Sequence, residues 1–257
     1  MSGQSGFLYV SQTDDESLRQ IQAGTRVQNS TRKPPWIIVD HTTASITIAH
    51  YPGTLWSVEV IDPATEEDFK AVETSGLLST ATYTRAIAVD VHQELPVSLL
   101  FGPQGEVICQ ILKTIDTLTE AQAEDLSRHL HADAEGVYAE AWRGWLTHED
   151  ARSIYLNQHR LQTLGIPGHH HDSPIDKGFY VIHHQVGNQA KKFTEGAALI
   201  VDDEGDVTLN PVWSAASTAC LHVAMRYGAK DWLSEAECNV LGAAWDVVIG
   251  SDRSSVL

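Results

Sequence analysis

Apolar and polar residues alternate along much of the first half of the chain. One such stretch has apolar residues at every second position, Trp56, Val58 and Val60, and polar residues at positions 57 and 59 between them. A period of two is typical of a β-strand with one buried face, because successive side chains point to opposite sides of a sheet. The pattern predicts strands at residues 7–10, 36–40, 45–50, 56–61, 83–91 and 107–112, with short helices at 14–23 and 65–72.

From residue 117 the apolar positions recur with a helical period. Residues 119–122 and 234–237 match the capping box, in which a Ser or Thr and a Glu or Gln three positions later satisfy free backbone N–H groups. Asn210 followed by Pro211 predicts another helix start. Apolar helix faces are predicted for Val137, Ala141, Trp142 and Trp145, and further on for Trp213, Ala216, Cys220, Val223 and Tyr227.

A second, smaller set of strands interrupts the helical half. The short apolar run at residues 179–184 predicts a strand, and residues 197–201 and 207–209 predict a hairpin around an acidic turn. Strands that cluster early and helices that cluster late indicate an α+β fold. We therefore expect a strand-rich N-terminal half and a helix-rich C-terminal half with a small second antiparallel sheet. Two lobes at 1–115 and 116–257 are favoured about equally with a single domain over 1–257.

Charge is distributed unevenly over the 257 residues, which hold 34 acidic and 17 basic side chains for a formal charge of −17. Residues 34–150 carry −14 and residues 193–257 carry −7, whereas residues 151–192 carry +3. The acid excess argues against a nucleic-acid backbone or an anionic membrane as a partner. No apolar run is long enough for a membrane helix, the N-terminus does not resemble a signal peptide, and the three cysteines form no CxxC motif, so we expect a cytoplasmic protein.

The basic segment also holds six of the thirteen histidines. Imidazole and carboxylate ligands suit zinc or another divalent metal, and an open coordination position would activate water for hydrolysis. If residues 179–184 form a strand, only one of the adjacent His183 and His184 can face the histidines of the preceding loop. The predicted ligands are His169, His170, His171, Asp172, His183 and His184. The alternatives are a solvated histidine run without a ligand, and a cluster that senses pH.

Two other sets of residues are candidate binding groups. Lys177, Lys191 and Lys192 would suit an anion or phosphate pocket. Trp56, Trp142 and Trp145 are candidates for a protein interface, since tryptophan is enriched at interface hot spots.

Two classes of function remain open, because the chain contains no GxxxxGK, GxGxxG, GxSxG or HExxH motif. The first is a binding module whose acidic residues 34–150 attract a basic protein partner, as in an immunity protein or an assembly subunit. The alternative is a metal-dependent hydrolase centred on residues 169–184. The sequence favours the binding module by a narrow margin.

Overall fold

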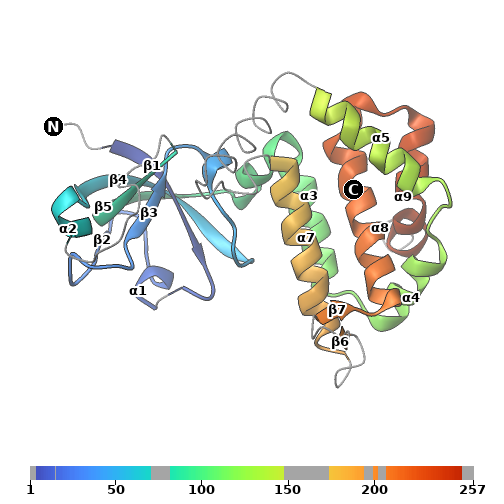
Figure 1. The fold of residues 1–257 in the computed structure, drawn as a ribbon, viewed down its shortest axis with the longest axis horizontal. Coiled ribbons are helices and arrows are strands. Elements are labelled where there is room, and N and C mark those ends of the chain that lie inside the picture. Colours follow the sequence, from blue (N-terminus) through green and yellow to red (C-terminus); the bar gives the residue numbers. More distant parts are fainter. Residues whose placement is uncertain are drawn as a thin grey trace. The chain divides into compact units, whose positions relative to one another are not determined.

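The chain divides into two compact units, residues 1–100 and residues 101–257, hereafter the sheet unit and the helical unit. A computed structural model describes residues 4–14, 16–70, 82–147, 174–193, 199–201 and 207–250 (Figure 1). Strands dominate the first unit and helices the second, and a small antiparallel sheet accompanies the helices. The predicted α+β class is therefore confirmed.

Within its described residues, the sheet unit contains five strands, three short helices and the start of a fourth. These are β1 (Gln4–Ser11), α1 (Glu16–Arg19), β2 (Arg26–Gln28), β3 (Ile37–Asp40), η1 (Thr43–Ser45), β4 (Gly53–Pro63), α2 (Glu66–Lys70), β5 (Tyr83–Leu95) and η2 (Val97–Gln104), which continues past residue 100. The described part of the helical unit then contains α3 (Gly105–Ile115), α4 (Glu120–Arg128), α5 (Ala134–Thr147), α7 (Pro174–Ala190), β6 (Leu199–Val201), β7 (Val207–Leu209), α8 (Pro211–Gly228), η3 (Lys230–Trp232) and α9 (Glu235–Val248).

The five-stranded sheet closes on itself, because its longest strand, β5, pairs with both β3 and β4. The order is β2-β5-β3-β1-β4, and β4 also pairs with β5. All these pairs are antiparallel, and the β4–β5 ladder contains bulges that bend it. The enclosed side chains are almost entirely apolar, as the alternation predicts. They include Leu8, Val10, Ile37, Val39, Trp56, Val58, Val60, Val89 and Val91.

Close backbone approach inside this closed sheet depends on two glycines. A Cβ atom at Gly6 would lie 2.5 Å from the carbonyl oxygen of Asp40, and one at Gly53 would lie 2.5 Å from the carbonyl oxygen of Val10. Such distances are far inside van der Waals contact. Only glycine therefore fits at these two positions of β1 and β4 without a shift of the neighbouring strand.

An ion cluster joins the loop before β3 to α2 at the edge of the sheet unit. Arg32 donates from Nε and Nη2 to the carboxylate of Asp68, at 2.8 and 2.9 Å, and the backbone N–H of Thr65 donates to the same carboxylate at 2.7 Å. These hydrogen bonds hold the pKa of Asp68 well below its usual range. Trp36 stacks on Phe69 beside the cluster, with ring centroids 4.6 Å apart.

Two predicted strands of the first half are wrong. Residues 45–50 form no strand, because Thr42 and Ser45 bond to each other's backbone and close the short helix η1, although Ile46 and Ile48 are buried as the alternation implies. Residues 107–112 lie in α3, which also places Cys109 on a helix. The buried positions of α3 follow helical spacing, which a six-residue window is too short to reveal. They are Ile108, Ile111, Leu112 and Ile115.

The helical unit is organised around α8, which packs against α4, α7 and α9. The predicted helix starts are confirmed, with Thr119 and Ser234 in complete capping boxes and the side chain of Asn210 accepting from the N–H of Trp213 at 2.9 Å. Burial raises the pKa of the Cys220 thiol to about 12, in keeping with its predicted place in the core. Among the described residues, no helix is long and apolar enough to cross a membrane.

The predicted strand at residues 179–184 is also wrong, because these residues belong to the 17-residue helix α7. The run resembles a strand because it combines aromatic and β-branched residues. Two of the buried positions of this helix are occupied by glutamines. The apolar residues alone therefore do not show the helical repeat. The buried positions are Val181, Ile182, Gln185, Val186, Gln189 and Ala190.

Candidate functional site

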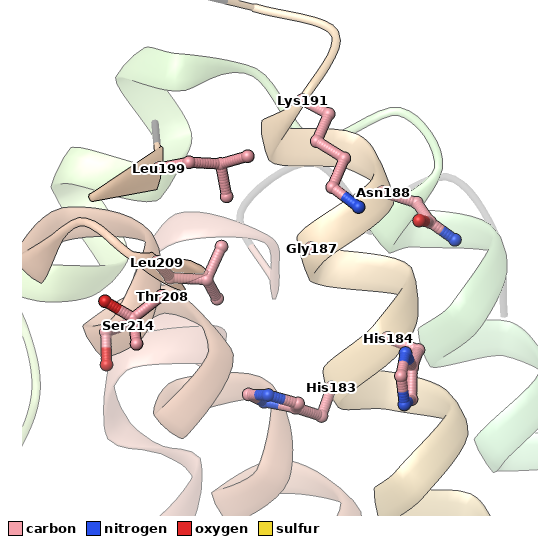
Figure 2. A pocket seen from close by; sticks show the side chains of 9 residues that line it. All are labelled: His183, His184, Gly187, Asn188, Lys191, Leu199, Thr208, Leu209 and Ser214. Atoms are coloured by element: carbon pink, nitrogen blue, oxygen red, sulfur yellow. The ribbon is translucent and has the colours of Figure 1, made fainter. Parts of the chain in front are cut away.

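A cavity of about 400 Å³ lies between α7, the β6–β7 hairpin and the first turn of α8 (Figure 2). This volume is within the range of small-molecule sites in proteins. Its lining side chains are exposed or half-buried, so the cavity can be reached from solvent. The described lining residues are His183, His184, Gly187, Asn188, Lys191, Leu199, Thr208, Leu209 and Ser214.

Helix α7 supplies one wall through residues spaced by four. His183 and Gly187 lie one turn apart on one side of the helix. Lys191 directly follows the end of α7 and continues this row, because its N–H donates to the carbonyl of Gly187 at 3.2 Å. Because α7 is a helix, the adjacent His183 and His184 are not on opposite faces as a strand would require, and both line the cavity. Figure 2 shows the His183 ring extending from α7 toward α8.

Gly187 leaves an opening in the middle of this wall. A Cβ atom built at this position meets no other heavy atom within 4 Å. A larger side chain here would enter open space rather than displace a neighbour. The absence of a side chain at Gly187 therefore contributes directly to the width of the cavity.

The two histidines are oriented by neighbouring side chains. His183 Nδ1 lies 3.2 Å from the hydroxyl of Ser217 on α8, within hydrogen-bonding distance. The His184 ring lies 4.2 Å from the ring of Tyr180, one turn earlier on α7, and 6.2 Å from the ring of His183 in an edge-on arrangement. These contacts limit the positions that each imidazole adopts at the cavity wall.

The opposite side of α7 is fixed by two glutamines that the hydrophobic pattern missed. Gln185 donates to the carboxylate of Asp116 at 2.7 Å, and Gln189 donates to the backbone carbonyl of Leu118 at 2.8 Å. Both glutamines are buried, and the Gln189–Leu118 bond is shielded from competing water, whereas Asp116 itself is exposed. They fix α7 against the end of α3 and the segment before α4, and so hold the wall of the cavity in place.

The hairpin and the start of α8 form the other wall. Leu199 pairs with Leu209 across the β6–β7 ladder, and both line the cavity. Asn210 follows directly and caps α8, which brings Ser214 to the same side. The predicted hairpin at 197–201 and 207–209 is confirmed for residues 199–201 and 207–209.

The three lysines predicted for an anion pocket have different surroundings. Lys191 lines the cavity, whereas the ammonium of its neighbour Lys192 donates to Gln189 Oε1 at 2.8 Å. Lys177 is only 1 % exposed. Of the predicted set, Lys191 is thus the one that contributes to this cavity.

The predicted metal site falls largely outside the described residues. Four of its predicted ligands lie there: His169, His170, His171 and Asp172. Among the residues that the structure describes, no group of three or more His, Cys, Asp or Glu is arranged to hold a metal ion. A divalent metal held jointly by His183 or His184 and the preceding loop stays a prediction. Metal analysis of the untagged protein, with His170→Ala and His183→Ala compared, is the measurement that checks it.

The tryptophans predicted for an interface are spread over both units. Trp56 is 7 % exposed and belongs to the apolar core of the sheet unit. Trp142 is half-buried on α5, with its ring 5.5 Å from that of Phe179 on α7. The side chain of Trp145 lies outside the described part.

The comparisons with known proteins give no relative for this chain. No protein family matches the sequence, and neither a curated protein nor a solved structure does. The function must therefore be argued from the residues and their geometry.

Proposed function

We propose that the helical unit binds a small anionic molecule in the cavity between α7, the β6–β7 hairpin and α8. The observation that carries this proposal is the charge of the cavity wall. Among the described lining residues, Lys191 is the one lysine or arginine, and there is no aspartate or glutamate. In a chain with a formal charge of −17, a wall of this composition favours a negatively charged ligand.

Neutral polar side chains support the same ligand. Asn188 and Ser214 carry an amide and a hydroxyl group that can donate to anionic oxygens, and His183 adds a ring nitrogen. An anion in the cavity would therefore find hydrogen-bond donors in addition to one positive charge. Charge-assisted hydrogen bonds of this kind are about twice as strong as neutral ones.

The proposal can be tested with inorganic phosphate as the probe and two adjacent lysines as a matched pair. We expect Lys191→Gln to remove the phosphate-dependent rise in melting temperature, and Lys192→Gln to retain it. Both variants lose one charge, but only Lys191 lines the cavity. Ionic strength is held constant with NaCl, and circular dichroism checks that both variants are folded.

The comparison between the variants separates binding from a general salt effect. Phosphate also stabilises proteins by exclusion from their surface, and this effect raises the melting temperature of all three proteins alike. An extra rise that is present in wild type and Lys192→Gln and absent in Lys191→Gln supports the site. Equal rises in all three proteins would rule it out.

A second proposed function is the binding of a basic protein partner, supported by the exposed carboxylates of α4 and α5. The arginines of these two helices are already paired with carboxylates, Arg128 with Asp125 and Arg143 with Glu140, each at 2.7 Å. Glu120 forms no ion pair with a lysine or arginine within the described residues. The exposed acidic residues from the end of α3 to α5 are Asp116, Glu120, Glu124, Asp133, Glu135 and Glu140.

Binding of poly-L-lysine at low and at high salt tests this second function. We expect the affinity to fall steeply between 50 and 300 mM NaCl, about the range over which screening becomes strong. Neutralising Glu120, Glu124 and Glu135 together should weaken binding more than neutralising Glu16, Glu66 and Glu67 of the sheet unit. Equal losses in the two triple variants would refute a specific acidic surface on α4 and α5.

A further inference from the structure

We infer that the ligand of the cavity is a phosphate monoester whose alcohol part is apolar and about the size of a phenyl ring. This inference rests on the anion-binding function proposed above and adds the class of ligand. It follows from the unequal chemistry of the two walls, from the volume of the cavity and from the number of its donors.

The two walls of the cavity differ in polarity. The α7 wall carries the charged Lys191 and the amide of Asn188, whereas the hairpin contributes the side chains of Leu199 and Leu209. The hairpin also contributes Thr208, whose hydroxyl already donates to the carbonyl of Ile200. Figure 2 shows both leucines on the hairpin side, across from the stretch of α7 that carries Gly187. A ligand that satisfies both walls has an anionic end directed to α7 and an apolar part against the leucines.

The volume argues against a bare inorganic ion as the complete ligand. A cavity of about 400 Å³ holds on the order of a dozen water molecules at the volume that each occupies in the liquid. A phosphate ion would displace only a minority of them and would leave the leucines in contact with water. Phenyl phosphate, with roughly a dozen non-hydrogen atoms, fills the space far better and releases water from apolar surface.

The donors favour a phosphate over a carboxylate as the anionic end. A monoester phosphate presents three terminal oxygens, and each accepts more than one hydrogen bond. The described lining residues offer an ammonium at Lys191, an amide at Asn188 and a hydroxyl at Ser214. The Thr208 hydroxyl already donates to the carbonyl of Ile200 at 3.4 Å. Lysine is a common phosphate ligand because its compact ammonium acts as a point charge.

Isothermal titration calorimetry with phenyl phosphate and inorganic phosphate tests the inference. The titrations are run at about pH 8.5, where both probes are mainly dianions, so the difference between them reports on the phenyl group. We expect phenyl phosphate to bind roughly tenfold more tightly than inorganic phosphate, since the ring removes apolar surface of the hairpin from water.

Two hairpin variants assign that difference to the apolar wall. Leu199→Ala should reduce the preference for phenyl phosphate to less than about threefold and leave the affinity for inorganic phosphate unchanged. Ile200→Ala is the matched control, because Ile200 is the next residue of β6, is 45 % exposed and does not line the cavity. It should keep the full preference, which also shows that truncating an apolar residue of β6 does not by itself abolish binding.

The outcomes separate this inference from the function on which it rests. Equal affinities for the two probes, with binding that still depends on Lys191, would overturn the monoester and retain the anion site. A preference for phenyl phosphate that survives in Leu199→Ala would also overturn the inference, because the hairpin wall would not be its cause. If neither probe binds in a way that depends on Lys191, the anion site and the monoester are overturned together.

Discussion

Glycine has opposite consequences in the sheet unit and at the cavity of the helical unit. At Gly6 a Cβ atom would lie 2.5 Å from the carbonyl oxygen of Asp40 and 2.6 Å from Cγ1 of Val39. At Gly187 a Cβ atom would meet no other heavy atom within 4 Å. The first glycine lets two strands approach each other, whereas the second leaves space that no side chain of the described residues fills.

This difference separates a structural position from a functional candidate. Interiors of folded domains are packed nearly as densely as organic crystals, and the region around Gly6 conforms to that rule. Glycine in a helix costs about 1 kcal/mol relative to alanine. No close contact at Gly187 requires so small a residue, so tight packing does not explain this glycine. Open space is equally present at Gly136, but Gly187 also lines the cavity, and we therefore interpret the space beside it as room for a ligand. Substitutions at Gly6 and Gly187 should behave in opposite ways.

The largest effect is expected for Gly6→Ala. The added methyl group overlaps backbone and side-chain atoms of β3, and one of the strands must shift to accommodate it. We expect a loss of about 3 kcal/mol in the free energy of unfolding, at the upper end of the usual cost of overpacking. Urea denaturation followed by tryptophan fluorescence measures this loss.

Gly136→Ala on α5 is the control for Gly6→Ala, since a Cβ atom there also meets nothing within 4 Å. It should stabilise the protein by roughly 0.5–1 kcal/mol through helix propensity alone. A Gly6→Ala protein as stable as wild type would show that the two strands are not as closely packed as described.

The second prediction concerns Gly187→Leu, which should fill the cavity without unfolding the helix. We expect the affinity for phenyl phosphate to fall by more than about tenfold, because the leucine side chain occupies the ligand's space. The melting temperature should stay the same or rise, since leucine is the better helix former. Titration calorimetry and thermal unfolding measure the two effects, and Gly136→Leu on α5 should change neither the cavity nor the affinity.

The packed core of the helical unit should be sensitive to mild acid through His222. This residue is 5 % exposed, its ring centroid lies 5.3 Å from that of Tyr138, and its Nδ1 has no hydrogen-bond partner among the described residues. Burial lowers the pKa of His222, opposed in part by the carboxylate of Glu135. Its contribution to stability is therefore complete above about pH 6.5 and is lost as the pH falls below that value, because the unfolded chain takes up the proton first.

Thermal unfolding between pH 7.5 and 5 measures this loss, and His222→Gln should flatten the profile. A further decline below about pH 4 is expected from the sheet unit, where the pKa of Asp68 is depressed and the stability it contributes is lost on protonation. A wild-type profile that is flat from pH 7.5 to 5 would contradict the assignment to His222.

The smallest effect is expected for Gly242→Ala on α9, although an added Cβ there would overlap Nη1 of Arg226. That atom ends a flexible side chain, so the arginine can move away at the cost of its 2.6 Å ion pair with Asp246. A partly exposed pair contributes up to about 1 kcal/mol, and the gain in helix propensity is similar. We expect stability within about 0.5 kcal/mol of wild type in urea denaturation, and a loss as large as that of Gly6→Ala would contradict this account.

The sequence predicted those elements whose signal is local. Alternation located β1, β3, β4 and β5, and the side chains of Thr119, Ser234 and Asn210 marked helix starts that the structure confirms. These signals depend on a few neighbouring residues, which is why a single sequence suffices. Helix α7 was missed because the buried Gln185 and Gln189 bond to groups about 70 positions earlier in the chain, which no local pattern can reveal.

The candidate site could be anticipated only in part. Lys191 was identified because positive charge is scarce in this chain and is concentrated in residues 151–192. Thr208, Leu209 and Ser214 carried no such signal, since ordinary polar and apolar residues become a binding wall only when the hairpin and α8 fold beside α7. A site assembled from three elements depends on tertiary packing, and its residue types alone do not identify it.

The most direct test of the central claim is a titration of ¹⁵N-labelled protein with phenyl phosphate, followed by the backbone amide signals. We expect shifts to concentrate at Gly187, Asn188, Lys191, Thr208 and Ser214, to saturate together, and to vanish in Lys191→Gln. Amides of the sheet unit, such as those of β1 and β3, should stay unchanged. Saturable shifts centred on the sheet unit, or shifts around α7 that persist in Lys191→Gln, would contradict the account.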